Sequence, residues 1–276
     1  MYALVALGLN LQYGVARIMN LSYGEIVIAA AIVAWAAFGG IGLSPLLTLL
    51  MVLPLSGLLG WLIYRLLLTP LVRRSPSREA LEADSLLGTF GLLFVIQGVM
   101  LVMVGGSYLS YSFLASPVNI VGSMVAANRL LALGVAVALG LAVWFMLTRT
   151  RLGTAIRAVA VDPVSAQLVA IDVKRMAMFA FALGSMLAAV AGVLISMFLT
   201  FSATMGVVFT MKSLIVVIMG GIGNIPGAVV AALMLGLVES YVATFVDPGL
   251  TLAANYALFL AVLLFKPTGL FGRGGR

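Results

Sequence analysis

Long stretches without a charged residue constrain the fold of this chain more than any other feature. The range 18–64 holds a single charge, at Glu25, and the ranges 85–128, 176–211 and 213–238 hold none. A membrane-crossing helix needs about 20 apolar residues to traverse roughly 30 Å of hydrocarbon. Charged residues make up 8% of the chain, against about 25% in a soluble domain. We therefore expect an integral membrane protein.

The apolar segments predict helices, because lipid offers no hydrogen-bond partner to an open backbone. The expected fold class is an all-α integral membrane protein, a polytopic bundle of about 8–9 transmembrane helices in a single domain spanning 1–276. Eight or ten crossings also fit, since the first segment is short and the seventh is compatible with a re-entrant path. The segments run over roughly 1–18, 25–41, 45–68, 84–104, 129–148, 174–201, 207–222, 226–246 and 249–266.

Basic residues gather in alternate loops, which the positive-inside rule places in the cytoplasm. The N-terminus is then expected outside and the C-terminus inside, and nine crossings fit that parity. Arg129 is the exception, at the outer end of its helix. The first apolar stretch lacks a basic region before it and a cleavage-like site, so we expect it to stay as a span. The cytoplasmic set comprises Arg17, Arg73, Arg74, Arg78, Arg149, Arg151, Arg157, Lys174, Arg175, Lys266, Arg273 and Arg276.

Several functional classes are excluded by what the sequence lacks. There is no Cys and no His, which excludes disulfides, a zinc site and Cys- or His-based catalysis. The glycine-rich range 220–227, GGIGNIPG, lacks the Lys-Ser/Thr ending of a phosphate-binding loop and is better explained as a tight turn between spans. The net charge of +7 resides mostly in loops and predicts orientation, not nucleic-acid binding. We expect no enzyme activity and no cofactor bound by this chain.

The loop from Arg149 to Lys174 is too long and too apolar to be a plain connector. Asp162 followed by Pro163 is typical of a helix start, where Asp caps and Pro is tolerated. Two short amphipathic helices are therefore predicted, and their apolar faces require a docking surface. That surface is either the lipid interface or a groove on another protein. The predicted faces are Leu152, Ile156 and Val159 in the first helix and Val164, Leu168 and Ile171 in the second.

Four polar residues within the spans are candidates for a translocation path. Lys212 and Glu239 both lie roughly 8–10 Å below the outer membrane boundary, at about 1.5 Å per residue. Buried charges are costly unless they are paired or hydrated, so the two either form a structural ion pair or line a wet path. Glu25 either stabilises a helix start through the helix dipole or faces the path. Asn10 lies mid-span and bonds either across the bundle or towards that path.

The loop RLGTAIRAVAVDPVSAQLVAI resembles the cytoplasmic coupling loop of ABC permeases, in the form found in the Liv family of branched-chain amino acid permeases. Other stretches resemble the same family in order: YALVALGLNLQYGVARIMNLSYGE, LLGTFGLLFVIQG, FALGSMLAAVAGVL, KSLIVVIMGGIGNIPGAVVAALMLGLVE and LLFKPTGLFG. The chain looks most like the H-type of the two paired permeases. One departure is Ala170, where the family usually has Gly.

The resemblance implies a transmembrane permease subunit of an ABC importer that moves branched-chain amino acids across the bacterial inner membrane. Implied partners are a second homologous permease, two ATP-binding subunits that use the ATP, and a periplasmic or lipid-anchored substrate-binding protein. The alternatives are a permease of the same family for urea or short amides, and an ion-coupled secondary transporter. The resemblance assigns the ATPase-coupling loop, about 149–173, to Arg151, Gly153, Arg157, Ala158, Asp162, Ala166 and Ile171.

Overall fold

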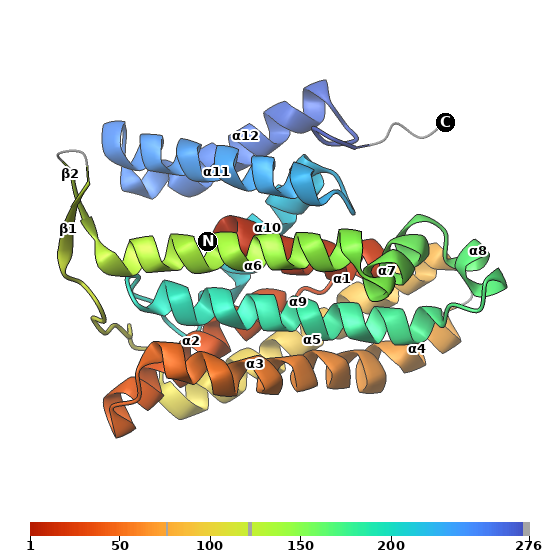
Figure 1. Ribbon diagram of the computed structural model, residues 1–276, viewed down its shortest axis with the longest axis horizontal. Helices are drawn as coiled ribbons and strands as arrows, with labels where there is room; N and C mark the ends of the chain where they lie inside the picture. The colour runs from red at the N-terminus through yellow and green to blue at the C-terminus, as the bar shows by residue number, and fades with distance from the viewer. Residues whose placement is uncertain (76, 121–122, 273–276) are drawn as a thin grey trace.

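A computed structural model describes residues 1–75, 77–120 and 123–272 as a bundle of helices that run mostly side by side (Figure 1). Within these residues, seven helical stretches are long and apolar enough to cross a membrane, and two shorter apolar helices accompany them. The all-α polytopic class is thus confirmed, and the apolar segments fall where the sequence predicts them. Arg273 and Arg276, expected in the cytoplasmic tail, lie outside the described residues.

The helices follow the predicted segments closely. A π-helical stretch (Ile63–Leu68) and α4 (Thr69–Arg74) continue α3 without a break, so the three together form one long span. The principal helices are α1 (Tyr2–Ala16), α2 (Tyr23–Ile41), α3 (Pro45–Leu62), α5 (Arg78–Val104), α6 (Ala127–Arg149), α9 (Val173–Ser196), α10 (Gly206–Gly220), α11 (Ile225–Phe245) and α12 (Thr251–Phe265), the last preceded by a 3-10 turn (Pro248–Leu250).

The two ends of the bundle differ. One end, here the hairpin end, carries the strands β1 (Pro117–Ile120) and β2 (Ser123–Ala126), which pair antiparallel (Figure 1, left). The other, here the basic end, carries the short helices α7 (Arg151–Val161) and α8 (Pro163–Leu168) (Figure 1, right). The hairpin is a departure from the helices-only expectation. Strand pairing satisfies its backbone groups at an end of the bundle, where spanning length is not required.

Helix α9 is the centre of the bundle and packs against α1, α2 and α3. Its most apolar window is 72% buried, whereas the corresponding window of α12 is 6% buried. Small residues on α9 permit this close packing: Gly184 lies against the backbone of α1, and Gly192 against that of α2. Lipid supplies no hydrophobic drive for helix pairing, so close approach through small residues holds such bundles together.

Helices α5, α6 and α12 form the outer surface of the bundle. Large apolar side chains on them are mostly exposed, for example Val102 on α5 at 89% and Leu264 on α12 at 80%. A soluble monomer rarely exposes contiguous apolar surface on this scale. These faces therefore suit contact with lipid or with another membrane-embedded chain.

Candidate translocation and coupling sites

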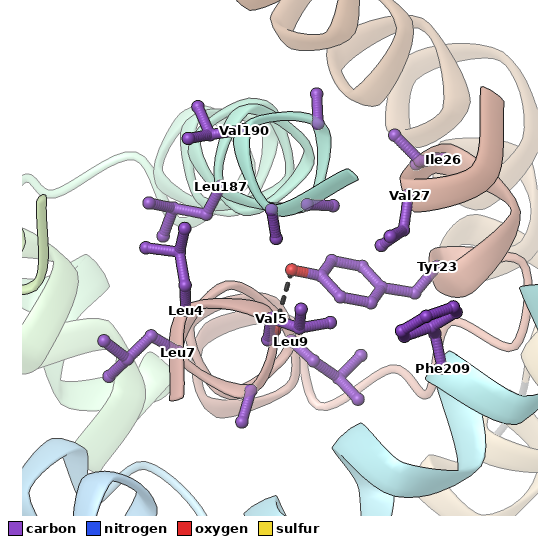
Figure 2. Packing of buried hydrophobic residues seen from close by; sticks show 14 of the residues in the cluster. Leu4, Val5, Leu7, Leu9, Tyr23, Ile26, Val27, Leu187, Val190 and Phe209 are labelled. Atoms are coloured by element: carbon purple, nitrogen blue, oxygen red, sulfur yellow. Dashed lines mark hydrogen bonds between the residues drawn. The ribbon is translucent and has the colours of Figure 1, made fainter. Parts of the chain in front are cut away.

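Helix α2 begins inside the bundle, not at its basic end. Helix α1 ends beside α7 at the basic end, where Arg17 adopts a left-handed conformation with φ 55°. The chain then turns back, and α2 starts at Tyr23, close to the middle of α9. There the Tyr23 hydroxyl points at the carbonyl oxygens of Val5 (2.9 Å) and Gly184 (3.2 Å), and its ring packs between α1, α2 and α9 (Figure 2). Residues 17–25, which connect the end of α1 to the first turn of α2, are called the central break below.

Polar side chains from neighbouring helices satisfy the backbone of the central break. The hydroxyl of Thr89 accepts a hydrogen bond from the Leu21 amide at 3.2 Å. The hydroxyl of Thr210 accepts one from the Gly24 amide at 2.8 Å and donates to the Leu21 carbonyl at 3.1 Å. Non-helical backbone is tolerated at membrane depth only where such partners replace water. The two threonines therefore hold the break in place.

A second chain of hydrogen bonds ties the break to α1 and α9. The amide of Gln12 donates to the Phe181 carbonyl at 3.1 Å and to the Ser185 hydroxyl at 3.3 Å. Asn20 in turn donates to the Gln12 side-chain oxygen at 3.1 Å, and its own oxygen accepts from the Ser22 hydroxyl at 2.7 Å. All five residues are buried. The sequence interpretation did not single out Gln12 or Asn20, although an amide inside an apolar run was the available signal.

Glu25 lies where two helices begin. It belongs to the first turn of α2, is fully buried, and its carboxyl packs against Gly206, the first residue of α10. Within the described residues, neither carboxylate oxygen has a hydrogen-bond partner. The positive ends of two helix dipoles favour a negative charge at this position. This geometry supports the helix-start interpretation, and a role for Glu25 in the path stays a prediction.

Asn10 bonds across the bundle, which is one of the two alternatives that the sequence left open. Its amide nitrogen donates to the Asn224 carbonyl at 3.1 Å, and its oxygen accepts from the Gly223 amide at 2.7 Å. Both partners belong to the turn between α10 and α11, the glycine-rich sequence that resembles a phosphate loop only superficially. A mid-span amide thus fixes that turn against α1.

Lys212 and Glu239 form the ion pair expected from their opposite charges at one depth. The Lys212 ammonium lies 2.7 Å from one Glu239 oxygen and also donates to the Tyr2 hydroxyl at 2.8 Å. Asn255 of α12 donates to the other Glu239 oxygen at 3.3 Å. Three helices besides α1 are joined by one polar cluster, which compensates the cost of placing charges in an apolar bundle. No described contact links this cluster to Glu25, and a part in translocation stays a prediction.

The predicted pair of short helices is present at the basic end. The Thr150 hydroxyl caps α7 by accepting from the Gly153 amide at 3.0 Å, and Asp162 caps α8 by accepting from the Val164 amide at 2.9 Å. Gly153 lies so close to the backbone of Leu147 that any larger side chain would collide with it. The glycine therefore allows α7 to fold back tightly against the end of α6.

The prediction that the apolar face of α7 docks at the lipid interface or on another protein is wrong for most of that face. Ile156 is 1% and Val159 0% exposed, because both pack into the bundle itself. On α8, by contrast, Val164 and Leu168 are exposed, at 62% and 84%. Of the other residues assigned to coupling, Ala166 is buried, Ala158 and Ile171 are half-buried, and Arg151 and Arg157 are exposed. Val161, Val164, Leu168 and Val169 together form the exposed apolar tip of the loop.

The turn after α8 shows why a glycine suits position 170, where this chain has Ala170. This residue has φ 61°, in the left-handed region that favours glycine. The Ile171 amide then bonds back to the Ala166 carbonyl at 3.1 Å and closes the turn. The local backbone is therefore the one that a glycine would adopt without strain.

Two cavities open at opposite ends of the bundle. The cavity at the hairpin end has a volume of about 630 Å³ and is lined by Tyr111, Asn128 and Arg129 among others. The cavity at the basic end has about 710 Å³ and is lined by Arg17, Trp144 and Arg157 among others. Each is therefore bordered by residues from several elements that are distant in the sequence.

The sequence of the whole bundle, from α1 to the end of α12, matches the family model of the branched-chain amino acid transport system permease component over residues 1–266. The chain belongs to this family. Its members are transport permease components, not enzymes, so the absence of a catalytic function follows from membership. No solved structure is significantly similar to the chain.

Curated relatives from bacteria and an archaeon match this chain over almost its whole length. The high-affinity branched-chain amino acid transport system permease protein LivH of Salmonella typhimurium is 28% identical, covering 99% of this chain and 91% of the relative. BraD of Pseudomonas aeruginosa, of the same description, is 26% identical over 99% and 92%. The probable LivH of Methanocaldococcus jannaschii is 27% identical over 98% and 88%. These relatives favour neither the amide permease nor the ion-coupled transporter.

Proposed function

We propose that this permease translocates branched-chain amino acids as part of an ABC importer, with ATP hydrolysed by separate subunits. The names of its relatives support the substrate class, and the exposed apolar tip of the coupling loop supports the coupling. ATP-driven closure of the partner subunits then pushes on α7 and α8 and switches the bundle between outward and inward access. This chain itself binds no cofactor in the proposed scheme.

The orientation and partners belong to the same proposal. The basic end faces the cytoplasm of a bacterial inner membrane, because it carries most of the Lys and Arg residues. Two ATP-binding subunits dock there, a second homologous permease completes the pathway within the membrane, and a substrate-binding protein delivers cargo at the hairpin end.

The proposed coupling is supported by a difference in burial between the two short helices of the coupling loop. Ile156 and Val159 anchor α7 to the bundle, whereas Val164 and Leu168 extend away from it with no covering residue in the described part of the chain. Apolar side chains presented by a short helix fit a groove on another protein. A rigid anchor with an exposed apolar tip transmits a push from that partner into α6 and α9.

A reconstituted system tests the substrate. Proteoliposomes with the two permeases, the ATP-binding subunits and the binding protein would be assayed for uptake of leucine, isoleucine, valine and urea. We expect ATP-dependent uptake of the three amino acids and none of urea. Uptake of urea alone would overturn the substrate assignment while leaving the ABC coupling intact.

Glu25 tests whether the central break belongs to the pathway. Glu25→Gln keeps the size of the side chain but removes its charge. A part in translocation predicts loss of uptake with an unchanged melting temperature, whereas a purely structural part predicts a changed melting temperature with proportionate uptake. Glu82→Gln on α5 is the matched control, since it makes the same change at an exposed carboxylate outside the break.

A further inference from the structure

The cavity at the basic end gathers residues that are far apart in the sequence. Arg17 follows α1, Trp144 and Thr148 lie near the end of α6, Arg157 belongs to α7, and Asn224 precedes α11. Its volume of about 710 Å³ falls within the range of about 300–1,000 Å³ that is typical of ligand sites. The cavity thus joins the coupling helix to the end of α1 and to the turn that Asn10 fixes.

The charge of this cavity is entirely positive. Among the described residues that line it there is no Asp or Glu, and neither described ion pair involves Arg17 or Arg157. Arg17 donates to the Ala160 carbonyl at 2.9 Å, at the C-terminal end of α7, where a cation is favourable. That bond uses one of the five donors of a guanidinium. No described hydrogen bond engages the side chain of Arg157, so both arginines have donors available for an anion.

The position of the cavity selects the kind of anion. Trp144 lines it and is 46% exposed, and the adjacent Phe145 is 59% exposed on the outer surface of α6. Tryptophan gathers at the level of lipid headgroups, and basic residues at the same level attract anionic lipids. Ile222 and Phe271 are exposed at the same cavity. The cavity therefore offers guanidinium groups for a phosphate beside apolar surface for acyl chains.

We infer that this cavity binds the phosphate group of an anionic phospholipid, held by Arg17 and Arg157, with the acyl chains along α6. The lipid would tie α7 to α1 and to the turn before α11, so that the coupling helix moves with the bundle. The inference rests on the membrane-spanning fold and depends neither on the transported substrate nor on which leaflet the basic end faces.

Lipid retention tests the site directly. The full transport complex would be reconstituted in nanodiscs of equal phosphatidylglycerol and phosphatidylcholine, released, and weighed by native mass spectrometry. We expect retained phosphatidylglycerol on this subunit, and about fivefold less of it in Arg157→Gln and in Arg17→Gln, the size expected for the loss of one basic residue that attracts an anionic lipid. Lys174→Gln is the matched control, since Lys174 is exposed at the same end but does not line the cavity.

Four results would overturn the inference. These are equal retention of phosphatidylcholine, an equal loss in the Lys174 variant, retention of inorganic phosphate in place of the lipid, and unchanged lipid retention in Arg157→Gln with loss of the ATP-binding subunit. The third identifies a site for free phosphate, and the fourth a protein contact. If the Arg17 variant does not fold, because its bond to Ala160 is lost, Arg157→Gln still decides the outcome.

Discussion

The central break and the α7–α8 segment both interrupt the long helices, but the first is buried inside the bundle and the second exposes apolar side chains. The backbone of the central break is satisfied by buried side chains of the same chain, namely Asn20 within the break and Thr89 and Thr210 on neighbouring helices. In the α7–α8 segment, capping residues satisfy the backbone locally, while Val164 and Leu168 stay exposed. The first region is complete within this chain, and the second presents a surface that suits a partner. Changes in the two regions should therefore have different consequences.

The largest effect is expected at Gly24 in the central break. A side chain there would meet the backbone of Gly206 and Thr210, which cannot move aside. Gly24→Val should lower the free energy of unfolding by about 3 kcal/mol or more, or prevent folding. Gly91→Val on α5 is the control, because open space surrounds Gly91. Thermal unfolding of the purified protein measures both variants. An equal loss of stability in the two would contradict the close packing at Gly24.

The next effect is expected at Leu168 and concerns assembly, not folding. Leu168→Asp places a charge on the exposed apolar tip and should weaken binding of the ATP-binding subunit by about 2–4 kcal/mol. The unfolding free energy of the permease alone should change by no more than about 0.5 kcal/mol. Pull-down titration and thermal unfolding measure the two quantities. Gln167→Ala, an exposed change on the same helix, should leave assembly intact, and normal assembly of Leu168→Asp would refute the docking surface.

A hydrogen bond of the central break has a smaller expected effect. Thr210→Val preserves the shape of the side chain but leaves the Gly24 amide and the Leu21 carbonyl without their bonds, which should cost about 2 kcal/mol of stability. Thr148→Val on α6 removes only hydrogen bonds to its own helix, at the Trp144 and Phe145 carbonyls, and should cost less. The melting temperatures of the two variants would be compared, and we expect the lower one for Thr210→Val. An equal loss would mean that the break does not depend on Thr210.

The smallest effect is a gain in the α7–α8 segment. Ala170→Gly removes the strain of a left-handed alanine, which costs about 1–2 kcal/mol. Glycine has more chain entropy in the unfolded state, and this offsets about 0.5–1 kcal/mol of the gain. A net gain of about 0.5–1 kcal/mol is expected from these terms. Ala155→Gly, inside α7, should instead destabilise by about 1 kcal/mol. Chemical unfolding would show opposite signs for the two changes, and a loss for both would contradict the strain at Ala170.

The spans and the short coupling helices could be predicted because local signals decide them. Uncharged runs of spanning length require helices, and Asp162 followed by Pro163 starts α8 regardless of the tertiary fold. The Lys212–Glu239 pair was also predictable, since opposite charges at one depth in an apolar bundle gain most by meeting. Each of these features follows from the order of residues along the sequence and from the cost of burying an unpaired charge or backbone group.

The central break could not be predicted, because its backbone is stabilised by residues far away in the sequence. Nothing local to Leu21 indicates that Thr89 and Thr210 will replace the missing helical bonds. For the same reason the packing of Ile156 and Val159 was predicted wrongly. An amphipathic helix face does not indicate whether it packs against another chain or against its own bundle. The placement of Arg17 and Arg157 around one cavity likewise depends on how α7 folds against α1.

ATP dependence of uptake tests the assigned role most directly. Proteoliposomes containing the complete complex and the binding protein would be loaded with ATP or with a non-hydrolysable analogue, and accumulation of labelled leucine would be followed. We expect accumulation against a gradient with ATP, none with the analogue, and none with Leu168→Asp. Accumulation of leucine by this chain alone, without ATP-binding subunits, would contradict its role as an ABC permease.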